Sequence, residues 1–215
     1  MKVIAFNGSP IKEGNTHSLI QAFFNVLNPS GIETEEINIG LKPVNSCLSC
    51  YKCMHNQDKK CAQTKDKLND YIARMEEADG IILASPVYFA QVSGQMKNFI
   101  DRAGFVCSVN GGLLKHKVGA ALVAVRRAGA LPAFHTMNDF FSYAQIHIVG
   151  STYWNIGFGL MPDEINADAE GQQTIRNLAR NMVWLLKSID AAKIPLPETE
   201  LGIWTNMVRE DLMGN

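Results

Sequence analysis

With 215 residues, 47% of them hydrophobic and 19% charged, the chain has the composition of one globular domain, which excludes wholesale disorder. The formal net charge is −1, whereas nucleic-acid-binding proteins normally carry a strongly basic face, so nucleic acid is excluded as the main partner. The longest apolar run, 118–125, is far shorter than the roughly 20 residues that span a bilayer, which excludes a membrane-spanning helix.

Strands and helices are expected to alternate along the chain. In order, we expect strand 2–7, helix 15–27, strand 31–39, a long loop over 43–65, helix 66–77, strand 80–84, helix 93–105, strand 118–125, helix 132–143, strand 145–149 and helix 168–189. The helices carry apolar residues at helical spacing, as at Leu19, Phe23 and Leu27. The continuous apolar runs 80–84 and 118–125 are typical of parallel strands buried on both faces.

This alternation indicates right-handed βαβ units and a parallel sheet with helices on both faces. Five strands fit an α/β, flavodoxin-like doubly wound sheet of order 2-1-3-4-5, in a single domain over residues 1–190. Ligands of such sheets bind beyond the carboxyl ends of the strands, at the switch point between strands one and three. Residues 191–215 form a C-terminal extension that we expect to pack on the domain or on a neighbouring subunit. Its apolar residues are Leu201, Ile203, Trp204, Met207, Val208 and Leu212.

The loop after the first strand has the features of a phosphate site. It is small, bears hydroxyl groups and opens directly onto a helix, whose N-terminal N–H groups and dipole favour an anion. Its candidate binding residues are Ser9, Lys12, Asn15 and Thr16. The loop is neither GxGxxG nor GxxxxGK[ST], which argues against a dinucleotide pyrophosphate or a nucleoside triphosphate. The alternative is a plain turn with Asn15 as the helix N-cap.

The loops after the third and fourth strands complete this edge of the sheet. In the loop after the third strand, aromatic residues and exposed backbone amides suit a flat heteroaromatic ring; otherwise they form a satellite hydrophobic cluster. The candidates there are Pro86, Val87, Tyr88 and Phe89. After the fourth strand, Arg126 and Arg127 precede a flexible Gly129, and we take Arg127 and Gly129 as candidates for contact with an anion. Solvated arginines are the alternative.

Four of the five cysteines lie in one short stretch: Cys47, Cys50, Cys53 and Cys61. One flexible segment thus offers four thiolates, as a [4Fe–4S] cluster needs, and neighbouring lysines offset the negative charge of thiolates and cluster. Bare thiols or a disulfide, and zinc bound by cysteines or His55, remain open alternatives, and the spacing ranks the cluster first and zinc last. The remaining Cys107 is expected to be a buried hydrophobe.

Three motifs in order resemble the NADPH-dependent FMN reductase family of flavodoxin-like proteins over about residues 1–160. They are Gly8-Ser9-Pro10 with Gly14-Asn15-Thr16, then Ser85-Pro86-Val87-Tyr88-Phe89, then Phe99-Ile100-Asp101-Arg102. The cysteine segment resembles the iron-sulfur flavoprotein branch. The resemblance implies an FMN phosphate at the first motif, an isoalloxazine ring against the second, electrons from NAD(P)H, and a homodimer or homotetramer with flavin sites near subunit contacts. We interpret Asp101 and Arg102 as an ion pair at a helix end.

We therefore expect a cytoplasmic FMN-dependent NAD(P)H oxidoreductase. It would pass electrons from the nicotinamide nucleotide through the flavin to a small-molecule acceptor, or through an iron-sulfur cluster to a protein electron carrier. No side chain is expected to be catalytic, because the flavin carries the chemistry. Two alternatives belong to other classes, a non-enzymatic flavodoxin-type carrier and a redox sensor built on the cysteines. The first is weakened by the net charge of −1, since such carriers dock through strongly acidic surfaces.

Overall fold

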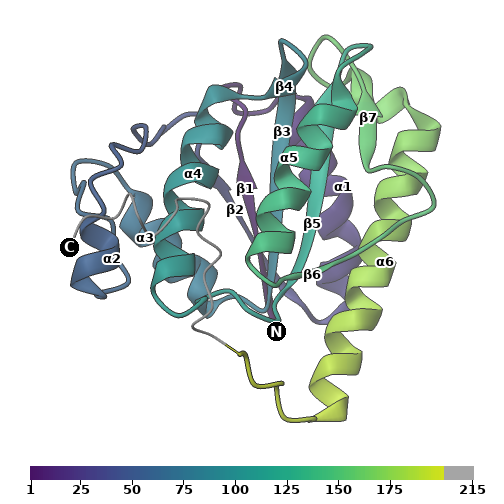
Figure 1. Ribbon diagram of the computed structural model, residues 1–215. Coiled ribbons are helices and arrows are strands. Elements are labelled where there is room, and N and C mark those ends of the chain that lie inside the picture. The colour runs from purple at the N-terminus through teal and green to yellow at the C-terminus, as the bar shows by residue number, and fades with distance from the viewer. Residues whose placement is uncertain (201–215) are drawn as a thin grey trace, which may run out of the picture.

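A mostly parallel β-sheet runs through the middle of the molecule (Figure 1). The computed structural model describes residues 1–200. The strands follow one another in space as β2-β1-β3-β5-β6, with β4 paired to β3 and β7 paired to β5. They are β1 (Lys2–Asn7), β2 (Glu33–Asn38), β3 (Gly80–Tyr88), β4 (Gln91–Val92), β5 (Val118–Val125), β6 (His147–Ile148) and β7 (Ile156–Phe158). This arrangement confirms the flavodoxin-like doubly wound fold, with the switch point between β1 and β3.

Helices cover both faces of the sheet. Helices α1 and α6 lie on one face, and α3, α4 and α5 on the other (Figure 1). The helices are α1 (Asn15–Leu27), α2 (Lys52–Asn56), α3 (Leu68–Glu77), α4 (Gly94–Val109), α5 (Ala130–Tyr143) and α6 (Ala169–Ala192). Two short 3₁₀ turns, Asn28–Ser30 and Glu164–Ala167, complete the regular structure.

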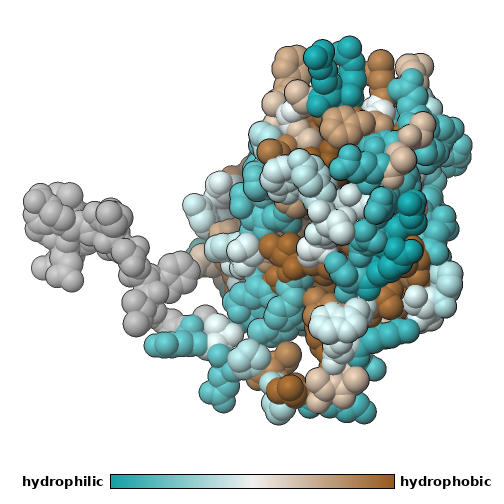
Figure 2. All heavy atoms as spheres, turned by 90° about the vertical axis from the view of Figure 1, so that its right-hand side faces the viewer, coloured by the Kyte–Doolittle hydropathy of each residue, from teal (hydrophilic) through white to brown (hydrophobic). Residues whose placement is uncertain are grey.

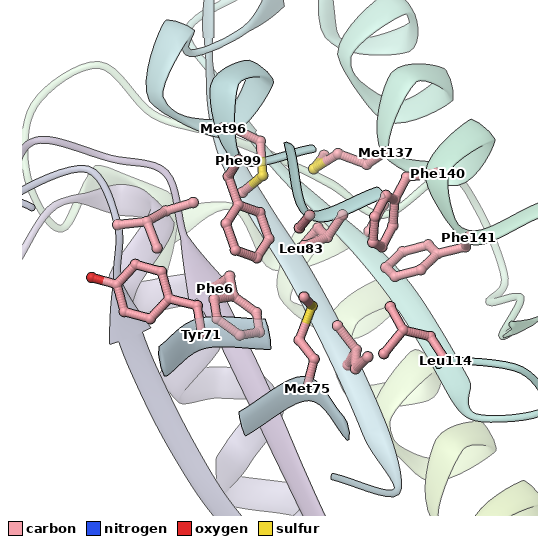
Figure 3. Packing of buried hydrophobic residues seen from close by; sticks show 14 of the residues in the cluster. Phe6, Tyr71, Met75, Leu83, Met96, Phe99, Leu114, Met137, Phe140 and Phe141 are labelled. Atoms are coloured by element: carbon pink, nitrogen blue, oxygen red, sulfur yellow. The ribbon is translucent and has the colours of Figure 1, made fainter. Parts of the chain in front are cut away.

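The larger hydrophobic core lies between the sheet and α3, α4 and α5, where aromatic and methionine side chains interlock (Figure 3). Phe6 of β1 stacks on Phe99 of α4 with ring centroids 4.7 Å apart, and Tyr71 of α3 meets Phe6 edge-on at 6.1 Å. These contacts fix α3 and α4 against the central strands. The two helices in turn support the cysteine segment that precedes them.

The fifth strand differs from the expectation of one strand over 145–149. It is split into β6, which pairs with the start of β5, and β7, which pairs with its end. Between them the chain leaves the sheet, and the buried Asn155 bridges the gap. The side-chain Nδ2 of Asn155 donates to the backbone carbonyl of Ala121, and the backbone carbonyl of Asn155 accepts from the N–H of Val123. A side-chain amide thus replaces part of the backbone ladder.

The segment 43–65, expected to be a loop throughout, contains the short helix α2. No helix among residues 1–200 is long and apolar enough to cross a membrane. Beyond α6, residues 193–200 have no regular structure. The six apolar residues of the expected extension, from Leu201 to Leu212, lie outside the described residues.

Candidate functional site

A pocket with about 570 Å³ of empty space, open solvent included, lies at the carboxyl ends of the strands. Six of the ten residues expected to bind the cofactor line it. They are Ser9, Asn15 and Thr16 from the loop after β1 and the start of α1, and Pro86, Val87 and Tyr88 from the end of β3. Two loops far apart in the sequence therefore form one open site at the switch point, where ligands of such sheets bind.

The loop after β1 is held in place by its own hydrogen bonds. The N–H of Ser9 donates to Asn7 Oδ1 at 2.8 Å, and the N–H of Ile11 donates to Ser9 Oγ at 3.2 Å. Gly40 packs on the loop so closely that a Cβ there would lie 2.1 Å from the carbonyl oxygen of Ser9. The N–H of Gly8 donates to the carbonyl of Ala84 on β3, which ties the loop to the neighbouring strand.

A partly buried polar network supports the side chain of the buried Asn7. Its Nδ2 donates to a carboxylate oxygen of Glu36 on β2 at 2.7 Å. The other carboxylate oxygen of Glu36 lies 2.7 Å from His17 Nδ1 and accepts from Gln21 Nε2 at 3.0 Å. The two side chains from α1 and the carboxylate from β2 thereby fix the amide that orients the loop.

The first turn of α1 faces the pocket without a side-chain cap. Its N-cap residue is Gly14, so the alternative interpretation of Asn15 as N-cap is wrong. The Asn15 side chain instead accepts from the N–H of Ile165 at 3.4 Å. Arg126 is the single lining residue with a formal charge. The uncapped helix end and this guanidinium give the pocket the electrostatics of an anion site.

Strand β3 continues past its expected end and turns into β4 as a hairpin. Both turn residues, Phe89 and Ala90, have left-handed φ angles, 46° and 61°. The turn points the Phe89 side chain into solvent, where it is fully exposed and outside the pocket lining, while Tyr88 lines the pocket. The hairpin therefore presents one of its two aromatic residues to the site.

Three further candidates, Lys12, Arg127 and Gly129, also lie outside the pocket lining. Gly129, with a φ of 85°, packs against the hairpin turn, and a Cβ there would lie 2.7 Å from the Cα of Ala90. Arg126 lines the pocket although its neighbour Arg127 was the expected contact, and a wall that follows β7 was not predicted. That wall consists of Gly159, Leu160 and Pro162.

The sequence contains one local indication of the wall that follows β7. Gly159 permits the chain to pass close to the start of α1, because a Cβ there would lie 2.8 Å from Asn15 Nδ2. A glycine directly after an apolar segment, as in Ile156-Gly157-Phe158-Gly159, indicates close approach of backbone at a strand end. The strand Ile156–Phe158 was not predicted, because three residues are too few to show an alternating or continuous apolar pattern.

The four clustered cysteines line a second pocket, bounded by α4. Cys47 and Cys50 are exposed, Cys53 and Cys61 are buried, and all are free thiols. Burial raises the pKa of the Cys53 thiol against backbone hydrogen bonds that lower it, and the nearby Cys61 and Cys50 add to the rise. These three thiols line the same pocket.

Asparagines on the adjoining helices hold the cysteine segment in place. Asn69 of α3 accepts the N–H of Cys61 at 2.8 Å and donates to its carbonyl at 3.0 Å. Asn110, which ends α4, donates to the carbonyl of Cys53 and accepts the N–H of Lys59. The two buried cysteines are thus fixed by backbone contacts to the folded core.

The Arg102 side chain was expected to pair with Asp101 at a helix end, and this expectation is wrong. Arg102 lies in the middle of α4, and its partner is Asp66, whereas Asp101 pairs with Lys97 one turn away. Burial alone would raise the pKa of the Asp66 carboxyl, but hydrogen bonds from Arg102 and from the N–H of Asn45 outweigh it, and the pKa is lowered. Asp66 is therefore the anionic partner of a buried cation.

The donor set of this pocket suits an iron-sulfur cluster by type. All four thiols line one cavity, and the guanidinium of Arg102 beside them favours negative charge. Within residues 1–200, no three His, Cys, Asp or Glu side chains are placed closely enough to hold a metal ion. A cluster would thus require the four cysteines to draw closer together.

Residues 1–160 match the NADPH-dependent FMN reductase family. The chain belongs to this family. An iron-sulfur flavoprotein of Methanocaldococcus jannaschii is 36% identical over 201 residues, which cover 88% of this chain and 99% of the relative. An iron-sulfur flavoprotein of Archaeoglobus fulgidus is 34% identical over 166 residues, 77% of this chain and 72% of the relative. The family and these relatives make the protein a flavin-dependent oxidoreductase.

Solved structures agree on the fold. RosB, solved with bound 8-demethyl-8-formylriboflavin-5′-phosphate, superposes with a TM-score of 0.72 at 16% identity, covering 98% of this chain and 93% of RosB. An NAD(P)H:quinone oxidoreductase from Methanothermobacter marburgensis has a TM-score of 0.65 at 15% identity, covering 85% of this chain and 98% of that one. At such identities the likeness concerns the fold alone.

Proposed function

We propose that this FMN reductase family member is an FMN-dependent NAD(P)H oxidoreductase that passes electrons from nicotinamide to a small-molecule acceptor or, through an iron-sulfur cluster, to a protein electron carrier. The observation that carries the proposal is the pocket at the switch point of the sheet. There an uncapped helix end and hydroxyl side chains line the same pocket as Pro86, Val87 and Tyr88. FMN, which joins a phosphate to a flat ring, matches both halves of this pocket.

The side chains of the pocket bind and orient the cofactor. Ser9, Asn15 and Thr16 would hold the phosphate together with the N–H groups of the first turn of α1. Tyr88 and the backbone around Val87 would lie against the ring. When bound, FMN accepts a hydride from NAD(P)H as two electrons and a proton and can release the electrons one at a time, which is chemistry that side chains do not supply.

The cysteine segment is the proposed site of a [4Fe–4S] cluster, held by Cys47, Cys50, Cys53 and Cys61. Relatives of this chain are named iron-sulfur flavoproteins. The four thiols on one cavity and the buried cation beside them support the same assignment here. Such a cluster would accept electrons singly and connect the flavin to a one-electron carrier.

The thiols and the surface support proposals for the location and the assembly of the protein. The five cysteines are all free, a state that the reducing cytoplasm maintains, and we propose a cytoplasmic location. On the face that α6 occupies, hydrophobic residues interrupt a hydrophilic surface (Figure 2). Trp184 on that helix is 70% exposed. These exposed side chains support a homodimer or homotetramer.

Anaerobic stopped-flow mixing tests the enzyme assignment. Protein purified with FMN and mixed with NADPH or NADH is expected to lose flavin absorbance within seconds, and the faster donor identifies the physiological nucleotide. A flavin that neither nucleotide reduces, but that a chemical reductant bleaches, would make the protein a carrier and overturn the assignment.

Anaerobic reconstitution tests the cluster. About four iron and four sulfide per chain are expected, and Cys50→Ala should lose them. Cys107→Ala is the matched control, because Cys107 is buried away from the pocket lining and should leave the iron content unchanged. Failure of the unmodified chain to take up iron, with NADPH oxidation intact, would reduce the function to that of a plain flavin reductase.

A further inference from the structure

A buried arginine lies against the cysteine pocket. Arg102 is 1% exposed, and its Nη2 donates to Cys61 Sγ at 3.1 Å and to the carbonyl of Gln63 at 3.1 Å. Its Nη1 donates to the carboxylate of Asp66 and to the carbonyl of Asn45 at 3.2 Å. The guanidinium therefore joins both ends of the cysteine segment, since Asn45 precedes the first cysteine and the other three partners are at or after the last.

Burial of the Arg102 guanidinium costs desolvation free energy, and a negative charge in the pocket would offset that cost. Burying a charge carries a large desolvation penalty, and a surface pair such as Arg74 with Glu35 avoids it. Arg102 has a single carboxylate partner, and its Nε is buried with no partner within residues 1–200. Of the residues that line the pocket, Arg102 alone carries a formal charge. The Nη2 group donates to a cysteine sulfur and the Nε–H group has no acceptor within residues 1–200, so the guanidinium could interact with an additional anion in the pocket.

We propose that Arg102 is a positioning residue that raises the reduction potential of the cluster in this pocket. The inference rests on the proposed function, because it presupposes that Cys61 ligates a [4Fe–4S] cluster. Four thiolates around an oxidised cube of charge +2 give a net charge of −2, and reduction by one electron makes it −3. A cation and an N–H donor at a ligand sulfur stabilise the reduced state more than the oxidised state, and hydrogen bonds to sulfur and net charge are known determinants of the potential.

Redox titration of the reconstituted protein, followed by electron paramagnetic resonance of the reduced cluster, tests the proposal. Arg102→Met is expected to lower the one-electron equilibrium constant for reduction at least tenfold, which is about 59 mV. Asp66→Asn, which keeps the shape and removes the opposing negative charge, is expected to raise it. A purely structural role for the ion pair would shift both variants in the same direction.

Two further variants keep the result interpretable. Arg74→Met removes an arginine from a surface ion pair and should leave the potential unchanged. Arg102→Met combined with Asp66→Asn leaves no unpaired buried charge, so the double variant is expected to fold if Arg102→Met alone does not. Its potential should be lower than that of Asp66→Asn alone, because it lacks the N–H donor to Cys61.

The outcomes separate the two assignments. The role of Arg102 is overturned, with the cluster left in place, if Arg102→Met has the potential of the unmodified chain or if the double variant has the potential of Asp66→Asn alone. Absence of any cluster from the unmodified chain overturns both. FMN content, measured in every sample, is expected to stay constant, since the two pockets share no lining residue.

Discussion

Thr16 is the buried hydroxyl residue at the start of α1, and it lines the pocket. Replacing it with valine keeps the side-chain shape and removes a donor to the FMN phosphate. A hydrogen bond to a charged group contributes about 1.5–3 kcal/mol, so we expect the Kd for FMN to rise about 10- to 100-fold. Fluorescence titration of the apoprotein measures the change.

Thr174→Val is the matched control for that variant, because Thr174 is a buried threonine on α6 that does not line the pocket. It should bind FMN with unchanged affinity. If Ser9→Ala, Asn15→Ala and Thr16→Val in one chain left the affinity unchanged, the phosphate would have to bind elsewhere.

Tyr88 and Phe89 are adjacent aromatic residues with opposite surroundings. Tyr88 lines the pocket, whereas the Phe89 side chain is fully exposed on the hairpin turn. We expect Tyr88→Ala to change the fluorescence and the reduction potential of bound FMN, because the ring loses its stacking neighbour. Phe89→Ala should leave both unchanged. Equal spectra and potentials in the two variants would assign Tyr88 to a hydrophobic cluster only.

Cys107 gives the stability of the protein a specific pH dependence. Burial raises the pKa of its thiol from 9.0 to about 12. Above pH 9 the thiol therefore ionises in the unfolded chain before it ionises in the folded chain, and stability falls as the pH rises toward 12. At pH 10 the loss is about 1.4 kcal/mol from this group.

Denaturant unfolding at pH 8 and pH 10 isolates this contribution when the unmodified chain is compared with Cys107→Ala. The cavity left by the substitution costs the same at both pH values, so the variant should lose about 1.4 kcal/mol less between them. The same pH-dependent loss in both proteins would contradict the shifted pKa.

At the scale of elements, the β3–β4 hairpin depends on a close approach of the loop before α5. Gly129 has a φ of 85°, and a Cβ there would lie 2.7 Å from the Cα of Ala90. Gly129→Ala is therefore expected to destabilise the fold by about 2–3 kcal/mol, since a left-handed alanine alone costs about 1–2 kcal/mol. It should also weaken FMN binding, because the displaced hairpin carries Tyr88.

Gly111→Ala provides the reference for that prediction. Gly111 has nearly the same φ, 87°, but a Cβ there would meet no atom within 4 Å. The variant should show only the cost of the left-handed alanine, about 1–2 kcal/mol, with FMN affinity intact. Equal unfolding free energies for the two variants would mean that the hairpin moves aside freely.

The elements with strong periodic patterns could be predicted from the sequence, and the contacts between distant segments could not. Pro86, Val87 and Tyr88 were identifiable as site residues because they follow an apolar run that ends at the switch point. Phe89 follows them directly, but a left-handed turn directs its side chain away from the pocket. The sequence gives no sign of this turn, because neither turn residue is glycine. The partner of Arg102 is 36 residues distant along the chain, so the adjacent Asp101 was the wrong local choice.

At the scale of the whole molecule, two pockets occupy one scaffold. The first lies at the carboxyl ends of the strands and the second against α4, and they have no lining residue in common. The helix α4 connects them mechanically, because Ser93 at its N-cap donates to the carbonyl of Gly8 and Arg102 in its middle holds the cysteine segment. A displacement of α4 would therefore affect both pockets together.

The assembly of the protein is the prediction that concerns the entire surface. Ile194 and Leu196 beyond α6 are 76% and 67% exposed, and in sequence they are followed by further apolar residues up to Leu212. Apolar surface of this kind marks contacts between chains. Light scattering is expected to give the mass of a dimer or tetramer for the full chain and a smaller mass after deletion of residues 195–215. Ile194→Glu with Leu196→Glu in the full chain should act in the same direction, because charges at an interface oppose burial. An unchanged mass with lost solubility would instead assign this segment to the surface of its own domain.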